Sequence, residues 1–283
     1  MASVTGRTGG EATRSGVEPS RSSRYALRAV AIAYVGLLVM LPLVTVIWHT
    51  FESGIAPVIA SLGQPDVVHA FTLTVEVPAI SVVANTVFGV GVALLLVRYR
   101  FVGRRVLGAL IDLPVAMSPV VVGLAIVLVY GSRNPIGSAL VSIGFPVVYA
   151  LPGMVLATVF VSLPLVLREV VPVLEEAGVE QDQAAQSLGA GAWQRFVRIT
   201  LPTIKWGIAY GVVLSIARCI GEFGAVKIVS GNLLNRTQTA TLVVEQKYQN
   251  FDQPGAYAMS FVLVIVAVAC ILAVALLRPK EET

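Results

Sequence analysis

The sequence predicts an all-α membrane protein with six transmembrane helices and both termini on the cytoplasmic side. Its mean hydropathy is +0.83, and only 13% of its 283 residues are charged, whereas about a quarter are charged in soluble domains. The apolar residues gather into stretches of about 18 or more, the length that a helix needs to cross a hydrocarbon layer of about 30 Å. The sequence lacks the ten-residue alternating pattern that is typical of membrane β-barrels.

The basic residues set the expected orientation, because Lys and Arg are retained on the cytoplasmic side of a membrane. Only Arg133, Arg236 and Lys247 lie in the loops on one side, and most other basic residues flank the spans on the opposite side. We therefore expect both termini and the long loop of residues 168–203 to be cytoplasmic. In chain order, the expected spans are residues 25–48, 70–97, 106–130, 148–167, 204–228 and 256–277.

The two ends of the chain are expected to be cytoplasmic tails. Residues 1–24 are rich in Ser, Gly, Thr and Arg and have no apolar periodicity, so we expect them to be disordered. The first apolar stretch, residues 25–48, is too late and too long for a cleaved secretory signal, and we expect it to remain as an anchor helix. Residues 70–277 then form the transmembrane domain, and residues 278–283 form the C-terminal tail.

The third span contains residues that interrupt a helix. Pro114 and Pro119 lie within it, and a proline removes a backbone donor and crowds a preceding carbonyl, so we expect a kinked or broken helix. Broken helices at membrane depth occur where they are buried in protein or line a wet cavity. Pro119 and Gly123 are therefore candidate residues of a translocation path, and a simple packing kink is the alternative.

Glycines recur at short spacings in several spans. Small residues allow helix backbones to approach one another closely, so we expect a compact bundle rather than isolated helices in lipid. The pairs are Gly89 and Gly91, Gly207 and Gly211, and Gly221 and Gly224.

Three charged residues fall in or near the outer end of the fifth span, where a charge is costly and predicts a partner or a function. Arg218 and Glu222 are one helical turn apart and can pair on the same face. The pair is either structural, or it belongs to a gate in which Arg218 or Lys227 supplies positive potential for a passing anion. Both interpretations remain open at this point.

The loop of residues 168–203 is the only long hydrophilic stretch between spans, and it predicts a helix, a turn and a second helix. Helical character extends over residues 175–188, and two glycines then stop the helix. A second helix is expected over residues 192–199, with Trp193 and Phe196 on one face because they are three residues apart.

The spacing within this loop is typical of a docking element for a soluble partner. Ala184 and Ala185 are small enough for a partner's side chains to pack over the helix, and Pro202 would help to fix the angle at which the next span leaves. An ordinary connecting hairpin is the alternative. The residues of the candidate element are Gln183, Ala184, Ala185, Gly189, Ile199, Leu201 and Pro202, with nine residues between Gly189 and Ile199.

Several kinds of chemistry lack support in the sequence. Cys219 and Cys270 fall inside apolar spans without metal-ligand spacing, so we expect small buried side chains and no metal site. A phosphate-binding loop of the form Gly, four residues, Gly-Lys-Ser/Thr does not occur, so any ATP must be used by another subunit. The basic residues show no interleaved aromatic pattern, and nucleic acid is not an expected partner. The basic turn of residues 98–105 is expected to contact anionic lipid or a partner subunit.

The loop spacing resembles the element of binding-protein-dependent ABC importer permeases that grips the ATPase subunit, with the consensus Glu-Ala-Ala, three residues, Gly, nine residues, Ile, one residue, Leu-Pro. One departure matters: Gln183 stands where the family usually has Glu, so the contact to an arginine of the ATPase loses its charge assistance. Asp182 faces elsewhere on the helix. Residues 218–231, 243–248, 163–174 and 112–123 are similar to sulfate/thiosulfate permeases of the CysW type and, less closely, to molybdate permeases.

This resemblance implies the fold of a type I ABC importer permease that moves sulfate, and thiosulfate, by alternating access. It implies four kinds of partner: two copies of an ATPase, a homologous CysT-type permease, an extracytoplasmic sulfate-binding protein, and membrane lipid. ATP and Mg would be bound by the ATPase, so this chain would need no cofactor and would perform no covalent chemistry. The expected location is the bacterial cytoplasmic membrane, as a multi-pass protein.

Three other functions were weighed against this one. A molybdate or tungstate permease would share the architecture, and a passive channel or membrane scaffold would need no ATPase. An intramembrane Ser-His protease is disfavoured, because the two histidines, His49 and His69, flank the first outer loop rather than a membrane-embedded serine.

Overall fold

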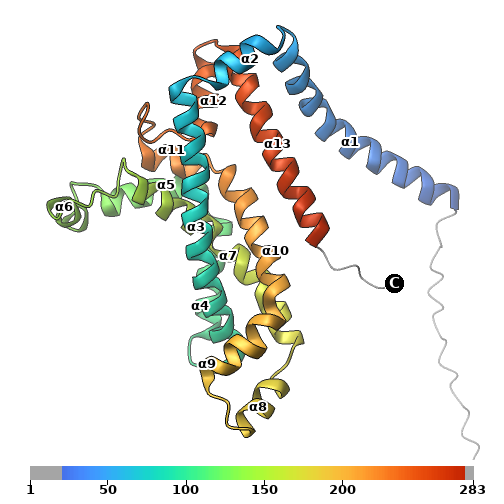
Figure 1. The fold of residues 1–283 in the computed structure, drawn as a ribbon, viewed down its shortest axis with the longest axis vertical. Helices are drawn as coiled ribbons and strands as arrows, with labels where there is room; N and C mark the ends of the chain where they lie inside the picture. The colour runs from blue at the N-terminus through green and yellow to red at the C-terminus, as the bar shows by residue number, and fades with distance from the viewer. Residues whose placement is uncertain (1–20, 278–283) are drawn as a thin grey trace, which may run out of the picture. The chain divides into compact units, whose positions relative to one another are not determined.

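A computed structural model describes residues 21–277, and the regular elements of this part are all helices (Figure 1). Within it, five helices are long and apolar enough to cross a membrane, or six if one bent pair counts as a span. The all-α class is therefore confirmed, and the six expected spans are reached if the bent pair is one span. In chain order the elements are α1 (Arg21–Phe51), α2 (Ile55–Leu62), α3 (Pro65–Arg98), α4 (Arg104–Ala116), α5 (Pro119–Tyr130), α6 (Pro135–Ser142), α7 (Leu151–Glu176), α8 (Glu180–Ser187), α9 (Ala192–Arg195), the π-helical turn η1 (Phe196–Thr200), α10 (Leu201–Ile220), α11 (Gly224–Ser230), α12 (Ala240–Gln249) and α13 (Gln253–Leu277).

The chain divides into two units, residues 1–45 and 46–283. In the first unit the structure describes the N-terminal part of α1, which begins at Arg21, four residues before the expected start of the first span. Residues 1–20 of the expected N-terminal tail and all of the expected C-terminal tail, 278–283, lie outside the described residues.

Three long helices, α3, α7 and α10, pack along one another in the second unit (Figure 1). Val90, Val166 and Ile204 belong to the buried core between them. A Cβ added at Gly89 would lie 3.2 Å from the Cβ of Val166, and one at Gly211 would lie 2.9 Å from its Cα. The close packing predicted for these two glycines is confirmed. It is wrong for Gly91, where an added Cβ would meet nothing within 4 Å.

A small polar cluster links the same three helices inside the apolar core. Asn85 of α3 is fully buried, and its Nδ2 donates to the carbonyl of Val159 at 3.1 Å and to Oγ of Ser162 at 2.8 Å. The thiol of Cys219 on α10 lies 3.3 Å from the same Oγ. Buried polar groups need such partners, so the cluster fixes the relative position of the three helices. Cys219 is buried as predicted, whereas Cys270 is half-buried.

The third span is broken, as its prolines predicted. α4 ends at Ala116, α5 begins at Pro119, and the two helix axes are bent by 110°. Ser118 adopts an extended conformation, which is the conformation favoured for a residue before proline. The break turns α5 across the bundle, where it packs against α11 (Figure 1).

The expected fifth span, residues 204–228, is wrong at its outer end. α10 begins at Leu201 and stops at Ile220. After three non-helical residues the chain starts a separate helix, α11. The break has an identifiable cause, because Glu222 accepts a hydrogen bond from the backbone N–H of Ala225 at 3.1 Å and so caps the new helix.

The structure also contains helices that hydropathy did not predict. α6 and α12 lie within the two long loops that follow α5 and α11, and α2 precedes α3. In the second unit, α2 and α12 lie at one end of the bundle, and α8 and α9 lie at the other end (Figure 1).

Candidate functional site

The predicted helix, turn and helix are present at one end of the bundle, with an additional break. α7 continues to Glu176, and Gly178 then turns the chain with a φ of +65° before α8 starts. A Cβ at this glycine would meet only the carboxylate end of the flexible Glu180 side chain, so it is the left-handed backbone conformation that favours glycine here. Helix α8 carries Gln183, Ala184 and Ala185, and none of its side chains is buried.

Gly189 ends α8 with a second left-handed turn, at a φ of +84°. The space around its missing Cβ is empty, so glycine is favoured here by the backbone and not by packing. Leu188 beside it is 89% exposed, which leaves a large apolar side chain facing outward. An exposed apolar side chain beside a glycine, whose backbone no side chain covers, is suited to contact with another protein.

Three of the seven residues predicted to form the docking element line one cavity. Ala185, Gly189 and Ile199 line one cavity of about 410 Å³, between the end of α8 and the turn η1. Arg195 and Arg198 also line this cavity and give it a basic rim. Gln183, Ala184, Leu201 and Pro202 do not line it, and all four are exposed nearby. Gln183 instead lines a separate cavity, so the docking role of the seven residues stays a prediction.

The second helix of this segment leads directly into the bundle. Trp193 and Phe196 lie on one face as predicted, with ring centroids 5.6 Å apart. α9 passes through η1 into α10, and Pro202 lies in the first turn of α10. The run Ala192–Ile220 contains 29 residues, which corresponds to roughly 40 Å at 1.5 Å per residue. A displacement at Trp193 can thus be carried to the far end of α10.

Two arginines attach α8 to its neighbours. Nη2 of Arg98, at the end of α3, lies 2.9 Å from Oδ2 of Asp182, and these side chains are only 15% and 18% exposed. Nη1 of Arg98 also donates to the carbonyl of Gly178. At the other end of α8, Nη1 of Arg195 donates to Oε1 of Gln186 at 2.8 Å. The ion pair agrees with the expectation that Asp182 does not face the docking surface.

The predicted pair of Arg218 and Glu222 is confirmed, with Nη1 and Oε2 2.5 Å apart. The two residues are not on one helix, because α10 ends between them. Glu222 is 3% exposed, and its other carboxylate oxygen caps α11 through Ala225. The structural interpretation is therefore the better one for this carboxylate, since it holds two helix ends together.

The third charged residue of the predicted gate, Lys227, is also paired. Its Nζ lies 2.5 Å from Oε1 of Glu245 on α12 and 5.1 Å from the centre of the Phe223 ring. The pair joins α11 to α12. The cation is 38% exposed, so it can still contribute positive potential at the surface.

Pro119 and Gly123 lie against this same region. A Cβ at Gly224 would lie 3.2 Å from the Cβ of Pro119, and one at Gly123 would lie 2.7 Å from the carbonyl oxygen of Ala225. The five residues predicted as a gate thus lie at or near two breaks, one between α4 and α5 and one between α10 and α11. The helices that follow the two breaks, α5 and α11, pack against each other. The sequence did not indicate that the two breaks meet.

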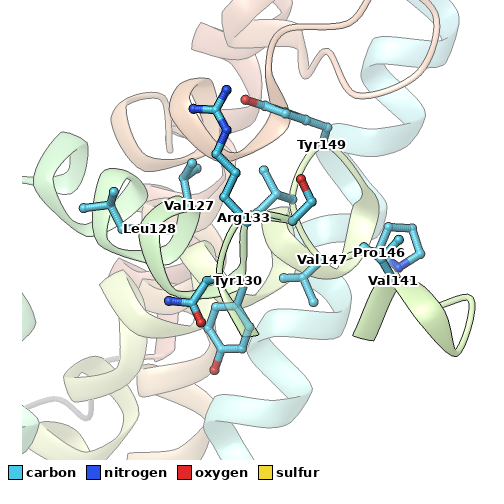
Figure 2. A pocket seen from close by; sticks show the side chains of 12 residues that line it. Val127, Leu128, Tyr130, Arg133, Val141, Pro146, Val147 and Tyr149 are labelled. Atoms are coloured by element: carbon cyan, nitrogen blue, oxygen red, sulfur yellow. The ribbon is translucent and has the colours of Figure 1, made fainter. Parts of the chain in front are cut away.

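A further cavity, of about 540 Å³, lies where α5 ends and the chain returns to α7 (Figure 2). Tyr130, Arg133 and Tyr149 line it together with apolar side chains. Arg133 and Tyr149 are exposed, and Tyr149 has a φ of +59°, which is unusual for a bulky residue. This cavity is lined by residues of the loop between α5 and α7. Within the described part of the chain, no three His, Cys, Asp or Glu side chains are grouped so as to hold a metal.

The sequence and fold are similar to those of known transport proteins. Residues 85–280 match the model of the family described as "binding-protein-dependent transport system inner membrane component". The sulfate transport system permease protein CysW of Synechocystis sp. is 46% identical, over 87% of this chain and 89% of that protein. The CysW protein of Escherichia coli is 38% identical over 100% of this chain and 95% of that protein. The CysT protein of the same organism is 34% identical over 88% and 90%.

Among solved structures, a bacterial alginate ABC transporter in complex with an alginate pentasaccharide-bound periplasmic protein has a chain of similar fold. The TM-score is 0.73, the sequence identity is 16%, and the match covers 92% of this chain and 93% of that chain. At this identity the likeness concerns the fold.

Proposed function

The chain belongs to the family of binding-protein-dependent transport system inner membrane components, and we propose that within it the chain is the permease subunit of an ATP-driven importer of sulfate and thiosulfate. The proteins named CysW, at 38% and 46% identity over most of their length, support this substrate. The proposed location is the bacterial cytoplasmic membrane, with both termini and α8 in the cytoplasm.

The observation that carries the proposal is an exposed segment at the α8 end of the bundle, residues 183–202, which we call the coupling segment. Ala185, Gly189 and Ile199 surround one cavity with a basic rim, and the helix that carries the first of them buries none of its own side chains. The face of this helix that carries Ala184 is exposed and is therefore open to a partner. In the proposed complex this partner is the ATPase subunit, which binds ATP and Mg.

The geometry suggests how a push on this segment reaches the anion path. The continuous run from α9 through α10 ends at the break where Glu222 caps α11. α11 packs against α5, beside Pro119 and Gly123. Movement of the ATPase would therefore shift α10 as a rod and change the packing between α11 and α5, opening one side of the path and closing the other.

Three further partners complete the proposed complex. A homologous CysT-type permease would form the other half of the path, and an extracytoplasmic sulfate-binding protein would deliver the anion to the loops that contain α6 and α12. The basic turn between α3 and α4 would contact anionic lipid. This chain contributes binding surfaces and a gate, while the chemistry of ATP hydrolysis belongs to the ATPase.

Radiolabelled sulfate uptake tests this function in a strain that lacks the chain, with and without its restoration. We expect restoration of the chain to restore uptake, and this uptake should depend on ATP. Unlabelled sulfate and thiosulfate should compete with the radiolabelled sulfate more strongly than molybdate does. Stronger competition by molybdate would assign the chain to molybdate transport instead. Sulfate flux that continues without ATP, together with failure of an ATPase to co-purify, would indicate a passive channel.

The coupling segment is tested separately by Gly189→Glu, which should abolish uptake and uncouple ATP hydrolysis while the chain still inserts in the membrane. The reason is that a side chain at a φ of +84° is strained and that a bulky anion would occupy the surface offered to the ATPase. The matched control is Gly191→Ala, because Gly191 has a φ of −68° and open space around its Cβ. Normal transport by the Gly189→Glu protein would contradict the docking role.

A further inference from the structure

Helix α8 is held in place by polar contacts rather than by burial. No apolar side chain of α8 is buried, and the helix is flanked by Gly178 and Gly189, which both adopt left-handed conformations. Apolar packing usually fixes the position of a surface helix. Here that contribution is missing, so the orientation of α8 depends on the few side chains that attach it to the bundle.

The attachment to α3 is the least exposed of these contacts. Arg98 makes two contacts at once, to the carboxylate of Asp182 at 2.9 Å and to the backbone carbonyl of Gly178. It therefore holds both the turn before α8 and the first turn of the helix. Because both charged side chains are more than four-fifths buried, water and salt screen the pair less than they screen a surface ion pair.

The pair also suits the two helix ends that it joins. Arg98 lies in the last turn of α3 and Asp182 lies in the first turn of α8. A cation at a helix C-terminus and an anion at a helix N-terminus are each favoured by the helix dipole. The arrangement is thus stabilised in both helices before their mutual attraction is counted.

We propose that Arg98 is a positioning residue that locks the coupling helix α8 to the end of α3 through Asp182 and Gly178. Motion that the ATPase imposes on α8 then moves α3 together with α10, instead of turning α8 about its two flanking glycines. This inference rests on the proposed coupling role of residues 183–202. It adds α3 to α7 and α10, the two helices between which the coupling segment lies in the chain.

The test uses the complete transporter in proteoliposomes and measures sulfate moved per ATP hydrolysed. Asp182→Asn removes the charge from α8 without touching the buried core, so the protein should insert, retain its ATPase and hydrolyse ATP. The transport ratio should fall at least about fivefold, within the range of typical coupling between sites. Arg98→Gln also removes the contact to Gly178 and should give at least the same loss, and the double variant should be no worse than Arg98→Gln alone, because both lack the pair with Asp182.

Two further variants separate positioning from general destabilisation. The exchange of charges in Arg98→Asp with Asp182→Arg should restore part of the transport ratio, which a merely structural disturbance would not do. Glu180→Gln is the matched control: it removes a carboxylate from the same turn of α8, one that takes part in none of the ion pairs among the described residues, and it should leave the ratio unchanged.

The outcomes distinguish this inference from the proposed function. A wild-type ratio in Asp182→Asn, or a double variant whose loss equals the product of the two single losses, would overturn the role of Arg98. If these variants transport normally while Gly189→Glu fails, the coupling segment stands without the attachment to α3. If Gly189→Glu also transports normally, the coupling role itself is wrong.

Discussion

The packing of α5 against α11 provides a sharp stability test, because it depends on the absence of one methyl group. A Cβ at Gly123 would lie 2.7 Å from the carbonyl oxygen of Ala225, 3.1 Å from its Cα and 3.0 Å from the Cβ of Ile228. Ordinary contacts of a Cβ begin at 3.4 Å. The shortfall at the carbonyl is 3.4 − 2.7 = 0.7 Å, and backbone atoms cannot rotate away as a flexible side chain would.

The substitution Gly123→Ala is therefore expected to destabilise the protein. Overpacking in a well-packed interior typically costs about 1–3 kcal/mol, and the better helix propensity of alanine returns about 1 kcal/mol. The net loss is on the order of 0–2 kcal/mol, and we expect the upper end because the nearest atoms belong to the backbone; about 2 kcal/mol corresponds to a fall of several degrees in melting temperature for a chain of this size.

Thermal unfolding of the purified complex in detergent measures this effect. Gly108→Ala in α4 is the matched control, since an added Cβ there meets nothing within 4 Å and the melting temperature should be unchanged or slightly raised. Sulfate uptake by Gly123→Ala should fall as well, because the clash lies at the proposed gate. Equal stability of the two variants would refute the close approach of α5 and α11.

Two further predictions concern the charged residues Glu222 and Asp252. Glu222→Leu removes both the partner of Arg218 and the cap of α11, so the melting temperature should fall, by an equivalent of about 1–3 kcal/mol, and an unchanged value would contradict the capping role. The second concerns Asp252, between α12 and α13, whose pKa is lowered from 3.8 because hydrogen bonds from Lys247 and the N–H of Gly255 together outweigh the burial that would raise it. A lowered folded-state pKa contributes stability that is present above the unfolded pKa and is lost as the pH falls through the folded value, so Asp252→Asn should be less stable than wild type at pH 7, and the difference should disappear once the pH has fallen below the folded-state pKa. A difference that persists in acid would exclude this cause.

Features that depend on neighbouring residues could be predicted from the sequence. Apolar length identified the spans, Pro114 and Pro119 identified the break in the third span, and the loop spacing selected Ala185, Gly189 and Ile199, which line one cavity. These features arise from the chain's local geometry: a proline acts on its own turn, and a helix of known rise fixes which residues share a face.

Contacts between distant segments could not be predicted in the same way. Arg98 was expected to face lipid or a partner subunit, but it binds Gly178, 80 residues later in the chain. A flanking arginine and a loop aspartate carry no sequence signal that they will meet, because their distance depends on how α3 and α7 pack. Asn85 was missed for a similar reason, since a single polar residue in an apolar stretch does not reveal which helix it faces.

The error in the fifth span shows how capping can override hydropathy. Residues beyond Ile220 include Ala225, Val226 and Val229, which are buried and apolar. Mean hydropathy therefore predicts that the span continues past Ile220. The helix nevertheless ends, because Glu222 is placed where its carboxylate can accept the N–H of Ala225 and bind Arg218 at the same time. A buried carboxylate is costly unless it is paired and hydrogen-bonded, and the break supplies both contacts. The charge of Glu222 scarcely lowers the mean hydropathy of this stretch. It nevertheless explains why α10 ends and why α11 begins as a separate short helix beside α5.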